Sequence, residues 1–365
     1  KGVKFIVKKT ALIMAGGRGE RFWPKSRRNL PKQFLSLTDD GITMIQHTVK
    51  RILPLVDIND VFISTNKEYI DLVREQLPNI PEENILCEPV SRNTAPCIAL
   101  AAGHIKSKYN DAIMIVLPSD HLIKNKEMFL YSLKDACEVA ENNTNLVTIG
   151  ITPTHPETGY GYIKFNNKRE IFGESAAFKV EKFVEKPKLE KAKEYLSCGT
   201  YLWNSGMFIW KVSSIMENFK ANLPDIYNGL QSIIKAVGTD IYKETLQEKF
   251  NELESISIDY GILEKADNIF VIPGTFGWDD VGSWLAIERI NKTDDFNNVI
   301  SGNIITIDTK NSIIQGTNKL IALVGVEDLI VVDAADAMLI CSKTDANKIK
   351  KVIENLKICN RNEYI

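Results

Sequence analysis

The chain has 365 residues, of which 44% are hydrophobic and 25% charged, the composition of a soluble globular protein with a sizeable core. Its 45 Lys and Arg residues nearly balance its 47 Asp and Glu residues, so no global positive charge would hold it on DNA, RNA or an anionic membrane. These values exclude disorder, collagen and a disulfide-rich miniprotein, and the length predicts one large and one small domain. Any binding of phosphate must therefore be local.

The cysteines and the N-terminus indicate a cytoplasmic protein. The 6 cysteines form no CxxC pair and stand at no metal-ligand spacing from a His, which is typical of buried thiols in a reducing compartment. Lys8 and Lys9 interrupt the first apolar stretch, and GGRGER follows it, so we expect a β-strand there and not a signal peptide. No uncharged apolar run reaches about 18 residues, so we expect no membrane span.

Apolar runs rich in β-branched residues alternate with segments of helical periodicity in the first part of the chain. This alternation predicts an α/β fold with a Rossmann-like, mostly parallel mixed sheet flanked by helices, and with ligands bound at the carboxyl ends of its strands. The expected strands are 11–14, 61–64, 112–117 and 146–149, and the expected helices are 42–53, 71–77, 95–109 and 129–141.

The pattern changes after about residue 157. Extended aromatic segments up to residue 210, separated by a short charged helix at 189–196, predict an antiparallel lid over the crevice at the carboxyl ends of the strands. A helical stretch (213–266), a strand (269–272) and a helix from near Gly282 then complete a first domain, 1–291. Short apolar runs at irregular spacing predict a small β-rich, β-helix-like domain at 292–365, which ends in an amphipathic helix near 346–356.

The segment AGGRGERFWPK follows the first expected strand. Its glycines allow backbone N–H groups to surround phosphate oxygens, and Arg18, Arg21 and Lys25 add cationic donors. It has the spacing of neither a P-loop nor GxGxxG, so a plain glycine turn with solvated arginines is the alternative. Lys32, in PKQF, can reach the same anion, although most such lysines are solvated.

The segment EPVSRNTAP indicates the start of a helix, because Asn93 or Thr94 can be its N-cap and Pro96 suits the first turn. Free N–H groups and polar side chains at such a helix N-terminus can bind a base or a ribose. The alternative is that Asn93 and Thr94 only cap the helix.

Two acidic positions suggest a metal site. Asp120, in LPSDH, follows the most apolar strand, where a carboxylate is costly unless it binds a cation or a donor, and a Mg²⁺ shared with substrate phosphates is a natural partner. Asp280, in GWDDVGSW, can supply a second carboxylate, with a helix N-cap as the alternative. For His121 we expect a structural or hydrogen-bonding role.

Three segments in the aromatic region carry groups that suit a sugar phosphate. Glu185 and Asn204 can bind sugar hydroxyls, and Lys186 can neutralise a sugar phosphate. The GYGY segment around Gly161 provides a flexible turn beside them, although a plain turn is an equal alternative.

Taken in order, nine such motifs resemble the mannose-1-phosphate guanylyltransferases (GDP-mannose pyrophosphorylases), a group of sugar nucleotidyltransferases. The resemblance runs from about residue 10 to residue 288, and the β-rich tail is similar to the C-terminal extension of that family. It implies the nucleotidyltransferase fold. The motifs are AGGRGERFWPKSR, PKQF, EPVSRNTAPCIALAA, LPSDH, ETGYGYI, FVEKP, WNSGMF, SIDYGILEK and GWDDVGSW.

The resemblance also implies roles for particular residues. Asp120 and Asp280 would bind Mg²⁺, and the catalytic set would be Arg21, Lys32, Lys186 and Asp120. The sugar-binding set would be Gly161, Glu185, Lys186 and Asn204. The nucleotide-binding set would be Ala15, Gly16, Gly17, Gly19, Arg21, Asn93, Thr94, Ala95 and Ser119.

The activity that the resemblance implies is transfer of GMP from GTP to mannose 1-phosphate, giving GDP-mannose and pyrophosphate. A homodimer through the β-rich tail is a further expectation. Some members of the family continue into a cupin-like isomerase domain, for which the printed sequence has no His-rich pattern, so a monofunctional transferase is expected. The alternatives are a nucleotidyltransferase for another sugar 1-phosphate, such as heptose or glucose, and a non-catalytic regulatory protein that binds a GDP-sugar.

Overall fold

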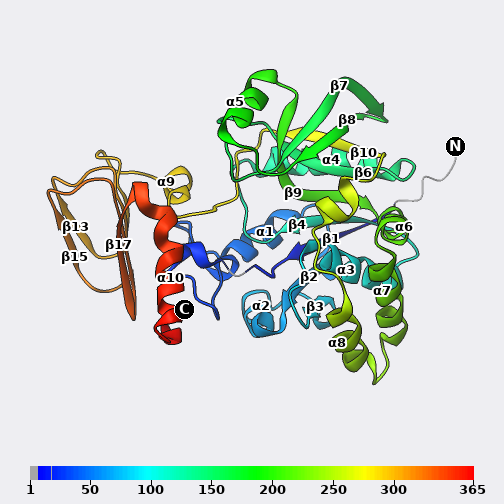
Figure 1. Cartoon of the computed structure of the whole chain (residues 1–365), viewed down its shortest axis with the longest axis horizontal. Helices are drawn as coiled ribbons and strands as arrows, with labels where there is room; N and C mark the ends of the chain where they lie inside the picture. Colours follow the sequence, from blue (N-terminus) through cyan, green and yellow to red (C-terminus); the bar gives the residue numbers. More distant parts are fainter. Residues whose placement is uncertain (1–6, 18) are drawn as a thin grey trace. The chain divides into compact units, whose positions relative to one another are not determined.

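The computed structural model (Figure 1) describes residues 7–17 and 19–365, and these residues form two compact units. The smaller unit combines an N-terminal segment with the C-terminal part of the chain, so the boundary predicted after residue 291 stays a prediction. The larger unit consists of the described residues up to Gly16, Val49–Pro118 and Ile123–Trp278; the smaller consists of Gly17–Thr48, Ser119–Leu122 and Asp279–Ile365.

The larger unit is built on a nine-stranded sheet in the order β3-β2-β1-β4-β9-β6-β10-β8-β7 (Figure 1). β8 and β9 run against the other strands, so the predicted mostly parallel mixed sheet is confirmed. The strands are β1 (Lys8–Met14), β2 (Val61–Asn66), β3 (Ile85–Glu88), β4 (Ala112–Pro118), β6 (Leu146–Ile151), β7 (Tyr162–Phe172), β8 (Ser175–Val184), β9 (Tyr201–Lys211) and β10 (Ile269–Gly274).

Two results differ from the expected pattern of strands. β3 was not expected, because four residues that include a charge leave little periodicity to detect. The aromatic region is antiparallel, as predicted, but it continues the central sheet. β7 pairs with β9, and β8 pairs with β10.

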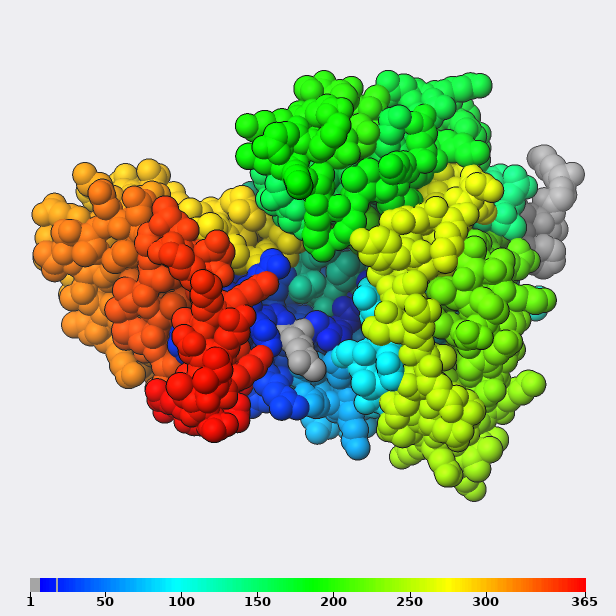
Figure 2. All heavy atoms as spheres, in the orientation of Figure 1, coloured from blue at the N-terminus to red at the C-terminus, as the bar shows by residue number. Residues whose placement is uncertain are grey.

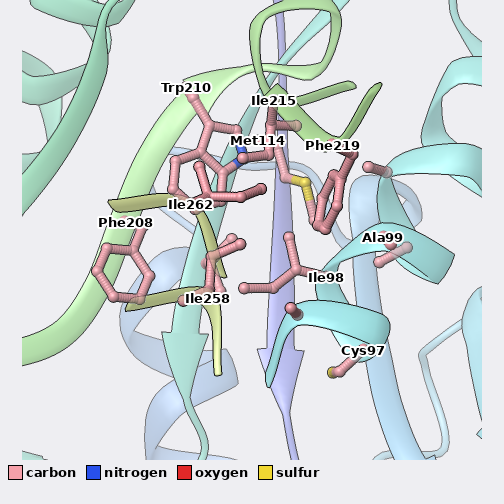
Figure 3. Packing of buried hydrophobic residues seen from close by; sticks show 14 of the residues in the cluster. Cys97, Ile98, Ala99, Met114, Phe208, Trp210, Ile215, Phe219, Ile258 and Ile262 are labelled. Carbon is pink, nitrogen blue, oxygen red and sulfur yellow. The ribbon is translucent and has the colours of Figure 1, made fainter. Parts of the chain in front are cut away.

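Helices and the sheet enclose the core of the larger unit. Figure 3 shows Met114 of the sheet close to Ile98 of α3 and Phe219 of α6, and Phe208 of β9 close to Ile258. The helices are α2 (Ile70–Gln76), α3 (Thr94–Lys108), α4 (Lys126–Glu141), α5 (Leu189–Cys198), α6 (Val212–Asn222), α7 (Pro224–Ala236), α8 (Tyr242–Glu252) and the π-helix η6 (Asp259–Leu263).

A small β-helix forms the C-terminal part of the smaller unit, as predicted. Equivalent positions in successive coils lie 14 residues apart and then 17 apart, which explains why the spacing in the sequence is irregular. The parallel coils contain β12 (Val299–Ser301), β14 (Ile313–Gln315) and β16 (Leu329–Ala334) in one sheet, with β17 (Ala337–Ser342) antiparallel to β16, and β13 (Ile304–Ile307) and β15 (Ile321–Val324) in the other.

The smaller unit also contains α1 (Met44–Ile52) up to Thr48, α9 (Ala286–Ile290) and the C-terminal α10 (Ile349–Ile358). A 3₁₀ segment at Lys343–Lys348 precedes α10, so the last helix begins slightly later than predicted. Two short strands, β5 (Leu122–Ile123) and β11 (Trp278–Asp279), pair with each other.

Trp284 fixes the glycine-rich segment to the core of the smaller unit. The indole is fully buried, its Nε1 donates a hydrogen bond to the carbonyl oxygen of Trp23 at 3.0 Å, and its ring centroid lies 5.1 Å from that of Phe22. The same cluster includes Val299 and Ile313 of the β-helix. The β-helix therefore belongs to the core on which this segment packs.

Only some of the cysteine thiols are buried, although the sequence predicted burial for all of them. Cys97 and Cys137 are buried, but Cys198 and Cys359 are exposed because they lie at the ends of α5 and α10. Across residues 7–17 and 19–365, no helix has both the length and the apolar character needed to cross a membrane.

The Trp284 hydrogen bond predicts the result of a substitution. Trp284→Phe leaves the Trp23 carbonyl without this donor and opens a cavity, so the free energy of unfolding should fall by about 2 to 4 kcal/mol in chemical denaturation. Trp210→Phe is the matched control: Trp210 is also fully buried, but its Nε1 has no hydrogen-bond partner among the described residues. An equal fall in the free energy of unfolding of the two variants would show that the Trp284 hydrogen bond does not contribute to stability.

Candidate active site

Hydrogen bonds from β2 hold the backbone where the glycine-rich segment leaves β1. The Ala15 amide donates to Ser64 O at 2.8 Å, Thr65 Oγ1 donates to Ala15 O at 3.0 Å, and Asn66 Nδ2 donates to Gly16 O at 3.2 Å. The segment therefore starts from a fixed position at the carboxyl end of a parallel strand, where open α/β sheets bind ligands.

In the smaller unit, Gly19 lies against Lys32. Gly19 has a φ of 58°, and a Cβ atom there would lie 2.5 Å from the Lys32 backbone nitrogen, so only glycine fits. Gln33 Nε2 also donates to Gly17 O at 2.9 Å, which ties the segment to the PKQF motif. Arg18, one of the expected cationic donors, lies outside the described residues.

A pocket of about 490 Å³ in the smaller unit brings four predicted residues together: Arg21, Lys32, Asp120 and Asp280. They come from three stretches of the chain that are far apart in sequence. The complete lining is Gly19, Glu20, Arg21, Phe22, Lys32, Asp120, His121, Asp280, Gly282 and Lys350.

Lys32 pairs with two other residues of this pocket. Its side chain is only 7% exposed, and Nζ lies 2.8 Å from Asp120 Oδ2 and 2.6 Å from Asp280 O. The alternative of a solvated surface lysine is therefore wrong. Burial opposes ionisation of Asp120, but the charges of Lys32 and then His121 outweigh it and hold the pKa of Asp120 below its usual value.

Asp280 stands in a strained turn. Its Oδ1 accepts a hydrogen bond from the Gly282 amide at 3.1 Å, and the intervening Val281 has a φ of 47°, which is unusual for a β-branched residue. α9 begins only at Ala286, with Leu285 as its N-cap. Asp280 is therefore not the N-cap of this helix, and the helix predicted from near Gly282 forms but begins at Ala286.

The two carboxylates fit the way in which proteins bind Mg²⁺. No group of three or more His, Cys, Asp or Glu side chains suited to a metal occurs in the described part of the chain. Mg²⁺, however, is usually held by one or two carboxylates together with substrate phosphates and water. Asp120 and Asp280 line one pocket with cationic side chains, which suits a metal shared with a phosphate ligand.

The predicted base-binding residues begin α3 in the larger unit. Asn93 is the N-cap, since its Oδ1 accepts a hydrogen bond from the Thr94 amide at 2.8 Å, and its φ is 68°. Thr94 Oγ1 accepts from the Ile258 amide at 2.8 Å, and the Ala95 amide donates to Ile256 O at 3.1 Å. The expected free N–H groups are thus already bonded at Thr94 and Ala95.

Ser119 lies in the smaller unit and is only 3% exposed. Its carbonyl oxygen accepts a hydrogen bond from Thr48 Oγ1 at 3.2 Å, and the pocket lining does not include it. Its predicted contact with a ribose stays a prediction.

The predicted sugar-binding residues converge in the larger unit. A Cβ atom at Gly161 would lie 3.0 Å from Glu185 Oε2 and 3.5 Å from Asn204 Cβ, and the Asn204 amide donates to Gly161 O at 2.8 Å. Lys186 Nζ lies 2.7 Å from Glu185 Oε1, and its side chain is 62% exposed. The cluster offers a carboxylate, an amide and an accessible ammonium.

Asp259 belongs to this cluster and was not predicted. Asn204 Nδ2 donates to Asp259 Oδ1 at 2.7 Å, while Asn204 Oδ1 accepts from the Gly206 amide at 3.1 Å, so both ends of the carboxamide are fixed. Burial raises the pKa of Asp259, and the nearby carboxylate of Glu185 raises it further. The motif SIDYGILEK contained Asp259, but its partner is 55 residues away in sequence.

Comparisons with known proteins agree with this arrangement. The family described as "Nucleotidyl transferase" matches residues 10–295, and the "MannoseP isomerase/GMP-like beta-helix domain" matches residues 302–356. The mannose-1-phosphate guanylyltransferase of Salmonella montevideo is 40% identical over 364 residues, covering 98% of this chain and 75% of the relative. That of Escherichia coli K12 is 39% identical over 358 residues, covering 97% and 74%.

A solved structure shows the same fold over nearly the whole chain. The protein from Thermus thermophilus described as a mannose-1-phosphate geranyltransferase has a TM-score of 0.86 and 34% identity, covering 96% of this chain and 99% of that one. The chain therefore belongs to the nucleotidyl transferase family and, within it, to the mannose-1-phosphate guanylyltransferases.

Proposed function

We propose that this protein transfers GMP from GTP to mannose 1-phosphate and thereby forms GDP-mannose and pyrophosphate. The observation that carries the proposal is the pocket in which Lys32, Asp120, Asp280 and the glycine-rich segment meet, in a chain about 40% identical to relatives that are named for this reaction.

The reaction needs no nucleophilic side chain. An oxygen of the sugar phosphate attacks the α-phosphorus of GTP, the new P–O bond forms, and the bond from the α-phosphorus to the bridging oxygen of the β-phosphate breaks. The electron pair of that bond leaves with pyrophosphate. Because a phosphate oxygen is already a nucleophile, the protein has to align the reactants and offset their charge.

In the smaller unit, Arg21 and Lys32 would stabilise the leaving pyrophosphate, and the glycines would let the backbone approach it. Lys32 keeps its position because it is held by Asp120 and by the carbonyl of Asp280. Asp120 and Asp280 would hold Mg²⁺, which when bound offsets negative charge on the phosphate oxygens.

The larger unit supplies the groups for recognition. Glu185 and Asn204 would bind the mannose hydroxyls, and the exposed Lys186 ammonium would bind the phosphate of the sugar. Thr94 and Ala95 are held by the segment 256–258, and Asn93 uses its Oδ1 to cap α3, so the Asn93 Nδ2 donor would face the base.

We also propose a cytoplasmic homodimer. Exposed apolar side chains recur on the strands of the β-helix, which supports a contact with a second copy: Ile300, Ile305, Ile307, Val324, Met338 and Ile340. Light scattering should give twice the mass of the chain, and Ile305→Glu combined with Ile307→Glu should give the monomer mass. A monomer in the unaltered protein would contradict the dimer.

Substrate specificity can be measured as pyrophosphate release. The protein is tested with Mg²⁺ and with GTP, ATP, UTP or dTTP against the 1-phosphates of mannose, glucose and N-acetylglucosamine. We expect release only with GTP and mannose 1-phosphate. Release with another pair would change the assigned substrates. No release with any pair would favour heptose 1-phosphate as the substrate or a binding protein without turnover.

The carboxylate pair predicts a second result. Asp120→Asn and Asp280→Asn keep the size of the side chain but remove its charge, so each should lower kcat by a factor on the order of 100 to 1000. Asp39→Asn, an exposed acid of the same unit, should leave kcat unchanged. Near-normal turnover of Asp120→Asn with Mg²⁺ would contradict its assigned role.

Asp259 predicts an effect on the sugar substrate alone. Asp259→Leu removes the acceptor that orients Asn204, so the KM for mannose 1-phosphate should rise roughly tenfold while the KM for GTP stays the same. Asp259→Asn keeps an acceptor oxygen and should have a smaller effect. Glu264→Gln, a nearby exposed acid, is the control. An equal rise in the KM for GTP would show a general disturbance of the fold.

A further inference from the structure

The C-terminal helix α10 packs against the glycine-rich segment within the smaller unit. Figure 2 shows α10 in red beside the blue N-terminal segment, and α10 contacts the short helix η1 (Glu20–Phe22). Ile349 and Ile353 are each 3% exposed and share an apolar cluster with Phe22. Lys357 Nζ lies 3.5 Å from Glu20 Oε1. These contacts fix the first turn of α10 relative to the segment.

Lys350, in that first turn, lines the same pocket as Lys32, Asp120 and Asp280. It is the only residue of the described pocket lining that lies beyond Gly282 in the sequence. The neighbouring Lys351 is exposed on the same helix but does not line the pocket. The helix thus directs one of two consecutive lysines toward the site.

The charges already in the pocket indicate that a triphosphate needs a further cation, which the Lys350 ammonium can supply. Lys32 is already paired with Asp120, so much of its charge is offset before a ligand binds. A nucleoside triphosphate brings several negative charges, which need further cations besides Arg21. Among the described residues, no carboxylate lies within ion-pair distance of Lys350, so its charge is available to a phosphate.

We propose that Lys350 is a substrate-binding residue that contacts the β- and γ-phosphates of GTP and the pyrophosphate they become. The β-helix domain would then contribute directly to the reaction as well as to the core. No bond to Lys350 forms or breaks in the transfer, since it acts only as a charged donor. The inference rests on the proposed function, because it assigns a ligand to the same pocket.

The test compares Lys350→Ala with Lys351→Ala in both directions of the reaction. We expect Lys350→Ala to raise two KM values roughly tenfold each. These are the KM for GTP in the forward direction and the KM for pyrophosphate in the reverse direction. The KM values for mannose 1-phosphate and GDP-mannose should not change. Lys351→Ala should have the same KM values as the unaltered protein. Lys350→Arg should retain most of the affinity for GTP and pyrophosphate, and Lys350→Glu should lose more of it than Lys350→Ala.

Thermal unfolding of each variant separates a lost contact from a lost fold, and Lys350→Gln replaces Lys350→Ala if the latter is unstable. Unchanged KM values for GTP and pyrophosphate, or equal effects of Lys350→Ala and Lys351→Ala, would overturn the inference. If the unaltered protein turns over no substrate pair, the proposed function is contradicted, but the inference about Lys350 is not yet decided. Calorimetric binding of pyrophosphate to the unaltered protein and to Lys350→Ala then still decides whether Lys350 binds the anion.

Discussion

The ammonium group of Lys32, buried between a carboxylate and a carbonyl oxygen, is the constraint on which the pocket of the smaller unit depends. A buried charge is stable only when it is paired, so Asp120 and the Asp280 carbonyl must lie where they do. Gly19 is required for the same reason, because any side chain there would displace Lys32. The pair also keeps Asp120 ionised, and an ionised Asp120 is what a metal or a phosphate-binding cation needs as a partner.

Precise placement of these charges depends on the apolar core beneath them. The segment that carries Gly19 and Arg21 is short and has little regular structure of its own, but Phe22 and Trp23 anchor it among Trp284, the β-helix coils and α10. A phosphate-binding segment in isolation would sample many conformations and lose most of its electrostatic advantage, since preorganised donors are effective only when they do not have to move. The β-helix is therefore part of the structural support of this pocket, whatever else it does at its exposed face.

The sequence predicted the features that depend on local patterns and missed those that depend on contacts between distant segments. The buried parallel strands, the small β-helix and the N-cap at Asn93 follow from periodicity and from the preference of Asn for helix ends. The helix expected from near Gly282 begins only at Ala286, and it is preceded by a turn in which Val281 adopts a conformation that no propensity predicts. Asp259 and Lys350 were missed for another reason: the motif around Asp259 does not reveal Asn204, and nothing local distinguishes Lys350 from Lys351.

The segment from Ile256 to Asp259 forms hydrogen bonds with both groups of residues that are proposed to recognise the substrates in the larger unit. It accepts a hydrogen bond from Ala95 and donates one to Thr94 on the side assigned to the base, and Asp259 at its end orients Asn204 on the side assigned to the sugar. It leads directly into a π-helix, a form that is rare and frequent at functional sites. Because one short backbone segment positions both groups, a change in its conformation shifts both at once. A change in the backbone of this segment is therefore expected to affect both groups of residues, whereas a change confined to the Asp259 side chain acts on Asn204.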